Sequence, residues 1–450
     1  MAKKPTVQFV CQQCAAIRIK WSGRCDNCGA WNSFVEQTTA PSTGNVVATS
    51  QGRPLAPQSI TQVAPSSKAG RLSTGLPDVD AVLGGGIVPA SVILLAGQPG
   101  IGKSTILMQL AHQVSAKHPV LYVSGEESTG QIKVRADRLG VEHEQLHLVS
   151  STSADDIAAT ISQSTYKLVI VDSIQTLTMA ALTSAAGSVG QITNSSNLLT
   201  QAAKNSDTAL IIVGHVTKEG SIAGPKVLEH MVDVVLNLEG DRYGGFKVLR
   251  AIKNRYGSTE EAGIFEMHDG GLRPVANPSA ALLEERTTSD GSVILATMEG
   301  NRPLLVEIQA LVNKSYFGYP KRTASGFDLN RLNVLVAVLE KRTKLNLSES
   351  DIYINVVGGI RIQDPAADLA VCMAIASATK EMQLDPNAVV FGEIGLSGEI
   401  RSVQHTSRRA SEAKKLGFTY AIGPKVGSDN AFVRPVATLR DALNTYLKKS

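Results

Sequence analysis

Four apolar runs set the hydrophobic pattern in the middle of the chain. Each run is nearly continuous in hydrophobic residues, and the stretches between the runs are long enough to form helices. Continuous rather than alternating hydrophobicity is typical of parallel strands that are buried on both faces. The runs are Val92–Leu95, Val120–Val123, Leu168–Val171 and Ala209–Val213. We therefore predict an α/β core with a doubly wound parallel sheet that ends near Leu272.

A second folded block begins at Ser292, after a polar stretch from Asn277 to Asp290. Its pattern predicts both strands and helices. The expected strands are Ile352–Val357 and Ala388–Phe391, and the expected helices are Leu329–Leu339 and Asp368–Thr379.

The N-terminal part has a different pattern. Residues up to about Phe34 are rich in Cys, Gly and Trp, and they are too few to bury a core unaided. From Glu36 to about Lys68, small and polar residues replace large apolar ones, as in a flexible linker. The expected domains are a head over 1–35, a linker over 36–70, the α/β core over 71–275 and a C-terminal domain over 285–450.

Composition excludes some classes of protein. Of the 450 residues, 43% are hydrophobic and 19% are charged, which is ordinary for a globular protein. The net charge of +4 is too small to indicate nucleic-acid binding by itself, so any DNA contact must come from local basic patches. No run approaches the roughly 18 apolar residues of a membrane-spanning helix, and the N-terminus lacks a secretory signal. We expect a cytoplasmic protein without a membrane partner.

A phosphate-binding loop follows the first apolar run. Residues 97–104, GQPGIGKS, match G-x-x-x-x-G-K-[ST], and a helix-compatible segment follows them. In such loops backbone N–H groups wrap the β-phosphate, the lysine reaches the β- and γ-phosphates, and the hydroxyl holds Mg²⁺. A chance glycine-rich turn is the alternative, and the flanking strand and helix count against it. The expected nucleotide ligands are Gly97, Gly100, Gly102, Lys103, Ser104 and Thr105.

Polar residues end the other three apolar runs. Asp172 follows the third run, where a carboxylate that organises Mg²⁺ with Ser104 is expected, although an acidic residue can merely end a strand. Glu126 and Glu127 follow the second run, and we prefer Glu126 as the base that orients the attacking water. The alternative is a solvated acidic pair at a helix N-terminus. His215 ends the fourth run at the same sheet edge, so we expect a γ-phosphate sensor rather than a merely hydrogen-bonded histidine.

Four cysteines within the first 28 residues indicate a metal site. Cys11 and Cys14 form one C-x-x-C pair, and Cys25 with Cys28 forms a second, so four thiolates can converge on one tetrahedral Zn²⁺. Disulfides are disfavoured in a cytoplasmic protein, and redox chemistry is disfavoured because no βαβ pattern surrounds either pair. The fifth cysteine, Cys372, lies in an apolar helical run, where a core position is expected.

Together these motifs resemble the bacterial RadA (Sms) family. The four-cysteine head, the GQPGIGKST loop, the SGEES strand end and Lys253–Gly257, KNRYG, occur in that family's order. Tyr256 replaces the phenylalanine of the family's KNRFG motif and keeps the aromatic ring. The resemblance covers the whole chain except the linker. It implies a RecA-like ATPase that uses ATP, Mg²⁺ and Zn²⁺ and forms rings, as a hexamer, on single-stranded and branched DNA. It also implies branch migration of recombination intermediates and the RecA recombinase as a partner.

The KNRYG segment follows an expected strand, Phe246–Ile252, and ends in a turn at Gly257. A turn at a sheet edge is well placed to reach a neighbouring subunit of a ring. We therefore expect Arg255 to contribute a permanently charged fork to the neighbour's γ-phosphate, with Lys253 as a second point charge. A basic turn that contacts DNA phosphates is the alternative.

The C-terminal block is similar in outline to the Lon protease domain, an α+β fold. Where Lon-type proteases carry the nucleophilic serine this chain has Ala366, and Ser407 stands in place of the activating lysine. A Ser–Lys dyad needs both a hydroxyl and an amine of depressed pKa. We therefore expect no peptidase activity and a scaffold for assembly and DNA contact. The basic residues expected to help in DNA contact are Lys321, Arg322, Arg331, Arg408 and Arg409.

Three functional hypotheses follow. The first is a DNA-dependent ATPase, a helicase-type motor that carries out branch migration and D-loop extension in recombination and repair. The second is a regulatory, clock-type RecA-like ATPase without a DNA substrate. The third is an ATP-dependent protease, which the missing dyad disfavours. The zinc head and the basic KNR segment favour the first hypothesis, and stimulation of ATP turnover by single-stranded DNA separates it from the second.

Overall fold

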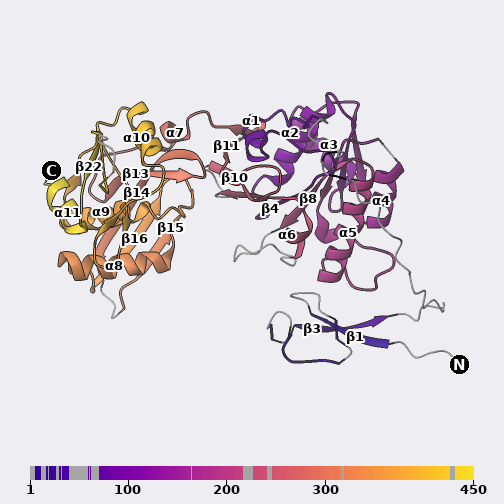
Figure 1. Cartoon of the computed structure of the whole chain (residues 1–450), viewed down its shortest axis with the longest axis horizontal. Helices are drawn as coiled ribbons and strands as arrows, with labels where there is room; N and C mark the ends of the chain where they lie inside the picture. Colours follow the sequence, from indigo (N-terminus) through magenta and orange to yellow (C-terminus); the bar gives the residue numbers. More distant parts are fainter. Residues whose placement is uncertain are drawn as a thin grey trace. The chain divides into compact units, whose positions relative to one another are not determined.

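The chain divides into two compact units in the computed structural model. The residues that the structure describes are 6–11, 17–18, 20–26, 30–31, 33–39, 59, 61, 70–163, 165–215, 227–240, 246–315, 319–425 and 431–449. The first unit comprises Met1–Leu238, Arg250–Thr259 and His268–Leu272, and the second comprises Glu239–Leu249, Glu260–Met267 and Arg273–Ser450. Figure 1 follows the elements of both units along the chain.

The head is a three-stranded antiparallel sheet in the order β2-β1-β3. Its strands are β1 (Thr6–Cys11), β2 (Ile17–Arg18) and β3 (Phe34–Thr39). The register of β1 with β3 runs from Thr6 opposite Thr39 to Cys11 opposite Phe34. Glu36–Thr39, predicted as the start of the linker, therefore belong to the head. The prediction was wrong there because their polar character concealed a strand that completes its backbone hydrogen bonds on β1.

The four predicted apolar strands are confirmed. They form β4 (Val92–Gly97), β5 (Val120–Ser124), β7 (Leu168–Asp172) and β8 (Ala209–His215), and their pairings within one sheet are parallel. In the described residues this sheet has nine strands in the order β12-β11-β10-β9-β4-β8-β7-β5-β6. The other strands are β6 (Leu146–Ser150), β9 (Val234–Gly240), β10 (Phe246–Asn254), β11 (Ala262–His268) and β12 (Gly271–Pro274).

Helices connect the parallel strands, as a doubly wound sheet requires. They are α2 (Lys103–Ser115), α3 (Thr129–Arg138), α4 (Ala154–Gln163), the 3₁₀ turn η2 (Ile174–Thr176), α5 (Val189–Asn205) and α6 (Val227–Met231), and a further helix, α1 (Pro77–Val82), precedes β4. Aliphatic side chains of α4 and α5, such as Ile157 and Leu199, pack with strand residues in one buried cluster. In the part of the chain that the structure describes, no helix combines the length and apolar character needed to cross a bilayer.

The second unit is built on a mixed sheet in the order β15-β16-β14-β13-β18-β21-β22. Its strands are β13 (Ser292–Glu299), β14 (Arg302–Lys314), β15 (Arg322–Ser325), β16 (Ser350–Val356), β18 (Ala388–Val390), β21 (Tyr420–Gly423) and β22 (Val433–Pro435). Two short pairs accompany the sheet: β17 (Gln383–Leu384) with β23 (Leu447–Lys448), and β19 (Glu393–Ile394) with β20 (Ile400–Arg401).

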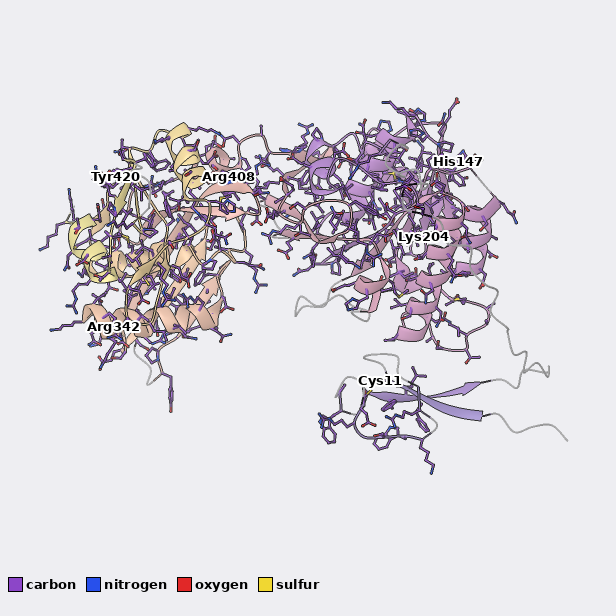
Figure 2. The ribbon with its side chains drawn as sticks, viewed as in Figure 1. Cys11, His147, Lys204, Arg342, Arg408 and Tyr420 are labelled. Atoms are coloured by element: carbon purple, nitrogen blue, oxygen red, sulfur yellow. The ribbon has the colours of Figure 1, made fainter. Side chains whose placement is uncertain are left out.

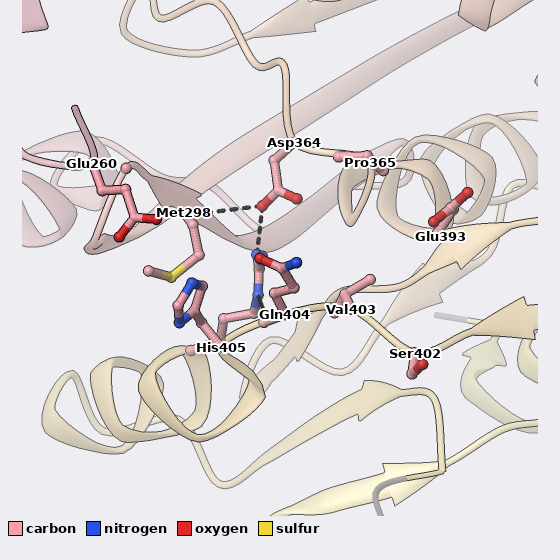
Figure 3. Close-up of a pocket in the computed structure, with 11 residues that line it drawn as sticks. Glu260, Met298, Asp364, Pro365, Glu393, Ser402, Val403, Gln404 and His405 are labelled. Atoms are coloured by element: carbon pink, nitrogen blue, oxygen red, sulfur yellow. Dashed lines mark hydrogen bonds and ion pairs between the residues drawn. The ribbon is translucent and has the colours of Figure 1, made fainter. Parts of the chain in front are cut away.

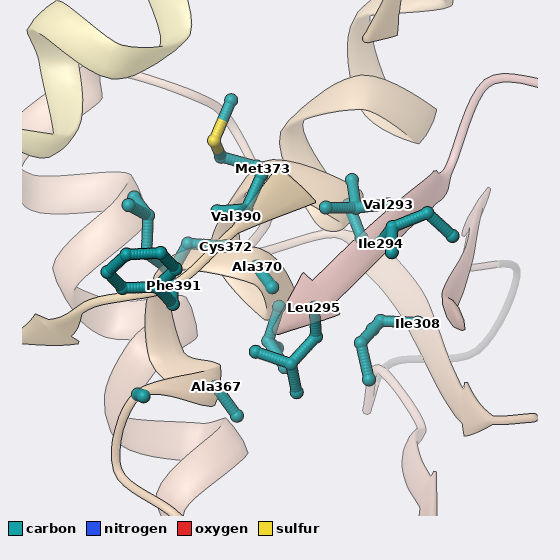
Figure 4. Close-up of a cluster of buried hydrophobic side chains, with 14 of the residues drawn as sticks. Val293, Ile294, Leu295, Ile308, Ala367, Ala370, Cys372, Met373, Val390 and Phe391 are labelled. Atoms are coloured by element: carbon teal, nitrogen blue, oxygen red, sulfur yellow. The ribbon is translucent and has the colours of Figure 1, made fainter. Parts of the chain in front are cut away.

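One buried helix organises this unit. The helices are α7 (Pro278–Leu283), α8 (Leu329–Thr343), α9 (Ala367–Lys380), α10 (Thr406–Lys415) and α11 (Leu439–Tyr446). Each residue of α9 from Ala367 to Ser377 is buried, because a helix that is apolar on all sides can only be stable inside a core. Figure 4 shows its Ala370, Cys372 and Met373 among side chains of β13 and β18. The predicted core position of Cys372 and the predicted mixed α/β class are thus confirmed.

Candidate nucleotide site and its surroundings

The loop between β4 and α2 has a backbone that suits a phosphate. Gly100 and Gly102 adopt φ values of +78° and +115°, in the region that side chains with a Cβ rarely enter. α2 begins immediately afterwards, at Lys103. The N–H groups of its first turn therefore face the end of the loop, with Ser104 and Thr105 in that turn.

Lys103 is buried beneath this loop. Its Nζ donates hydrogen bonds to the carbonyl oxygens of Gly97 and Gln98, at 2.9 and 3.0 Å. Burial lowers the pKa of Lys103 to about 8, and the negative charges of Asp172 and Glu126 partly oppose this shift. The amine therefore lies within electrostatic reach of both predicted acidic site residues.

The strand register brings the predicted residues to one sheet edge. Gly97 lies opposite His215 on the neighbouring strand, and Asp172 lies opposite Ser124, two residues before Glu126. Carboxyl ends of parallel strands form the edge at which such sheets bind ligands. The side chain of His215 lies outside the described residues, so its sensor role stays a prediction.

Asp172 is fixed by a residue that the motifs did not reveal. The hydroxyl of buried Tyr122 donates to Asp172 Oδ2 at 2.7 Å, and burial together with the Asp172 charge raises the pKa of Tyr122 well above its ordinary value. Asp172 and Ser104 both remain partly exposed. Carboxylate and hydroxyl oxygens suit Mg²⁺, so these residues fit the ion that ATP brings. Tyr122 lies inside an apolar run, where nothing in the sequence distinguishes it from a core residue.

The two glutamates of the SGEES segment have different partners. Glu126 Oε1 accepts a hydrogen bond from Ser173 Oγ at 2.6 Å. Glu127 forms an ion pair with Arg135 of α3, and its backbone N–H donates to Ser124 Oγ at 2.9 Å. The engagement of Glu127 with an arginine supports Glu126 as the carboxylate that orients water.

The KNRYG segment is tied to its own protomer. Lys253 Nζ donates to the carbonyl oxygens of Glu229 and Val232, both at 2.8 Å, where α6 ends. Arg255 Nη1 donates to Asp233 Oδ1 at 3.0 Å, although 56% of the Arg255 side chain is exposed. The carboxylate of Asp233 is itself buried.

This segment lies far from the phosphate loop of the same protomer. The backbone N–H of Asp233 donates to Val92 O, and Asp233 Oδ2 accepts the N–H of Val92, the first residue of β4. The phosphate loop begins at Gly97, the last residue of β4. A strand rises roughly 3.3 Å per residue, so the two ends of β4 are about 16 Å apart. The structure therefore does not bring Arg255 together with Lys103.

The head contains two of the four predicted zinc ligands within the described residues. Cys11 and Cys25 are buried and share a cluster with Phe34, while Cys11 Sγ lies 3.2 Å from Ser33 Oγ. Figure 2 shows Cys11 within this small sheet. Cys14 and Cys28 lie outside the described residues. So small a cluster is no independent core, and the thiol side chains of Cys11 and Cys25 suit Zn²⁺, which would crosslink the turns.

Comparison with known proteins identifies the chain's family. Residues 58–221 match the AAA domain, residues 9–36 the rubredoxin metal binding domain, and residues 330–426 the subunit ChlI of Mg-chelatase. The DNA repair protein RadA of Halalkalibacterium halodurans is 47% identical over 99% of this chain and 100% of that protein. That of Bacillus subtilis is 46% identical over the same shares. The chain belongs to the DNA repair protein RadA family.

The matched family models assign a domain type to each part of this RadA-family chain. The core is an AAA P-loop ATPase domain, the head is a zinc-ribbon domain, and the C-terminal domain has the ChlI-type, Lon-like fold. A crystal structure of the RadB recombinase is 21% identical, with a TM-score of 0.38, over 45% of this chain and 99% of that chain, which is too loose a fit to add to these assignments.

The Lon-like domain of this RadA-family chain has a cavity next to the residues that directly precede Ala366. The cavity has a volume of about 510 Å³ and lies beside Asp364, Pro365 and His405 (Figure 3). Ala366 is buried at the start of α9, and Ser407 is exposed on α10. Neither residue supplies a nucleophile paired with an amine.

An ion pair lines this cavity. Arg409 Nη1 donates to Asp364 Oδ2 at 2.6 Å and to Ala296 O at 2.8 Å. Although burial opposes it, hydrogen bonding to Arg409 lowers the pKa of Asp364 below its ordinary value. The prediction that Arg409 contacts DNA was therefore wrong, because the guanidinium is buried and its hydrogen bonds end inside the domain.

Arg331 is likewise not a separate surface charge. Its guanidinium pairs with the buried carboxylate of Asp368 and donates to Ile394 O at 3.0 Å. Of the predicted basic group, Lys321 and Arg408 are exposed and Arg322 is half-buried. These three remain candidates for DNA contact.

Proposed function

We propose that this chain is a DNA-dependent ATPase, a helicase-type motor that processes recombination intermediates by branch migration and D-loop extension. Its substrates in this proposal are single-stranded and branched DNA, its partner is the RecA recombinase, and it acts as a homohexameric ring. One observation supports the motor most strongly. Arg255 is bound to Asp233 beside the first residue of β4, and the phosphate loop begins at the other end of that strand, about 16 Å away along it.

That separation gives Arg255 a role between subunits. An arginine that stabilises phosphoryl transfer must reach the γ-phosphate, and the protomer's own nucleotide is too distant. The exposed guanidinium of Arg255 can instead meet the nucleotide of the next subunit in a ring. ATP turnover in one subunit would then depend on the position of its neighbour, which is the coupling that a motor needs.

Within each protomer the residues divide the work of hydrolysis. Lys103 would stabilise charge on the β- and γ-phosphates, and Ser104 with Asp172 would hold Mg²⁺. The ion, when bound, neutralises phosphate charge. Glu126 would orient the attacking water, with its carboxylate held by the Ser173 hydroxyl. His215, opposite Gly97, would report the γ-phosphate to the segment that follows it.

The outer domains serve the motor in this proposal. The zinc head and the Lon-like domain would contact DNA and stabilise the ring. The Lon-like domain would have no peptidase activity, because neither Ala366 nor Ser407 can replace its counterpart in a Ser–Lys dyad.

Steady-state ATP turnover with and without single-stranded DNA tests the proposal, together with unwinding of a forked or D-loop substrate. We expect DNA to stimulate turnover and ATP to drive strand displacement. Turnover that is indifferent to DNA, without displacement, would support the regulatory, clock-type ATPase instead. Lys103→Ala, which removes the charge at the phosphates, should abolish both ATP turnover and strand displacement.

A further inference from the structure

The head exposes both tryptophans of the chain. Trp21 is 56% exposed and Trp31 is 72% exposed, and the sequence has two tryptophans in all. An indole ring buries a large apolar surface when it is packed, so domains normally cover it. Two exposed indoles on so small a domain indicate a binding surface.

Both rings are positioned by their neighbours. Arg24 and Trp31 face each other in an antiparallel bridge, and the Arg24 guanidinium lies 5.8 Å from the centroid of the Trp31 ring, within range of a cation–π contact. The six-membered ring of Trp21 lies against Gly23, where an added Cβ would come within 3.6 Å of it. Each indole is thus supported from within the head while most of its surface stays accessible.

Basic residues lie close to the two tryptophans in the sequence. Residues 1–39 contain five basic and two acidic side chains. One of the acidic residues, Asp26, is paired with Arg18. Lys20 directly precedes Trp21 and is exposed. Aromatic rings interleaved with cations are the combination that proteins use to hold single-stranded nucleic acid, with bases stacked on the rings and phosphates near the cations.

We propose that Trp21 and Trp31 form a base-stacking platform for single-stranded DNA, with Lys20 and Arg24 beside the phosphates. A single strand fits better than a duplex, because paired bases keep their faces inside the double helix. Stacking accepts any base, so the platform should show little sequence preference. This inference rests on the proposed DNA-dependent function and adds that the zinc head holds the strand.

The two tryptophans also make the platform measurable in the full-length protein. Because no other tryptophan exists in the chain, intrinsic tryptophan emission reports on the head alone. The protein is titrated with an oligothymidylate, and emission is recorded beside the anisotropy of a fluorescently labelled copy. We expect emission to be quenched in step with the rise in anisotropy. A blunt duplex of equal length should quench little.

Variants separate stacking from general apolar contact. Trp31→Ala should weaken oligothymidylate binding about 5- to 100-fold, the effect of losing one stacked base, and Trp31→Phe should recover most of it. Val35→Ala, which shortens an exposed apolar side chain in the same head, should bind like the parent. Equal zinc content in each variant shows that the head is folded.

The outcomes distinguish this inference from the proposed function. Anisotropy that rises while emission stays constant overturns the platform and leaves DNA binding in place. Unchanged affinity of a zinc-loaded Trp31→Ala variant overturns it as well. Anisotropy that does not rise at all means that the protein does not bind the oligothymidylate, and this result contradicts the proposed function itself.

Discussion

Arg255 donates to Asp233 at 3.0 Å, and the same carboxylate accepts the N–H of Val92, where the strand leading to the phosphate loop begins. Asp233 is buried, so its charge needs these partners. Lys204 is a further one, with Nζ 3.5 Å from Asp233 Oδ2. One carboxylate thus joins the KNRYG segment to the central strand of the ATPase core.

Asp233→Asn should weaken this junction without disturbing the phosphate loop. The amide oxygen can still accept from Val92, but Arg255 loses its charged partner. We expect the free energy of unfolding of the core to fall by about 1–3 kcal/mol, and DNA-stimulated turnover to fall while ADP affinity is kept. Denaturant unfolding and ADP titration measure these effects. Lys204→Ala, which removes a half-exposed partner, should cost less than about 1 kcal/mol, and an equal loss in both variants would contradict this account.

ADP binding should depend on pH through Lys103. Its pKa is lowered to about 8 by burial, so the amine is already charged below that pH. Above it, phosphate binding must restore the proton, and affinity should fall toward tenfold per pH unit. Calorimetry in two buffers of different ionisation enthalpy should show proton uptake at about pH 9 and little at about pH 7. Lys103→Arg, which stays charged, should lose this dependence. If ADP affinity still depends on pH in that variant, the titration belongs to another group.

The two adjacent glutamates should differ sharply on amidation. Glu126→Gln should bind ATP and hydrolyse it about 10² to 10⁴ times more slowly, since it keeps the shape but loses the water-orienting carboxylate. Glu127→Gln is the matched control and should lose mainly the contact with Arg135. Single-turnover hydrolysis with a separate binding measurement distinguishes the two steps. Wild-type hydrolysis by Glu126→Gln, with slow hydrolysis by Glu127→Gln, would exchange their roles.

Sequence patterns predicted the features that depend on residues close together in the chain. Continuous apolar runs identified β4, β5, β7 and β8, and the glycine spacing identified the phosphate loop. The sequence also predicted that the residues around the phosphate loop lie at one sheet edge, because parallel strands bring their carboxyl ends to the same edge. The motifs also suggested, without a structure, that KNRYG does not serve its own nucleotide.

Such patterns could not predict hydrogen-bond partners that are distant in the sequence. Asp233 and Tyr122 reach Arg255 and Asp172 across the fold, and neither stands in a recognisable motif. The burial of Arg409 was missed because an arginine on a polar helix is usually solvated, and only the fold reveals Asp364 beside it. Glu36–Thr39 looked like a linker because pairing with β1, rather than hydrophobicity, defines that strand.

The Asp364–Arg409 pair should be essential to the Lon-like domain. Arg409→Met leaves a buried carboxylate without its cation and should cost about 3–5 kcal/mol at neutral pH. The lowered pKa of Asp364 stabilises the domain above the carboxyl's ordinary pKa, near 3.9, and this stabilisation is lost as pH falls through the lower folded value. Denaturant unfolding at neutral and acid pH measures both effects. Asp364→Asn combined with Arg409→Met should recover much of the loss, and a double variant as unstable as Arg409→Met alone would exclude the ion pair as the cause.

Mixing of inactive subunits tests the central claim, that Arg255 completes the nucleotide site of a neighbour. Arg255→Ala and Lys103→Ala subunits are each expected to be inactive in DNA-stimulated ATP turnover, and equal melting temperatures show that both are folded. In mixed rings, some interfaces join an intact phosphate loop to an intact Arg255. We predict that turnover rises above that of either variant alone and is highest near equal proportions. If every mixture stays inactive, and Arg255→Ala alone keeps DNA-free turnover but binds DNA with a smaller salt dependence, Arg255 contacts DNA phosphates and the claim is contradicted.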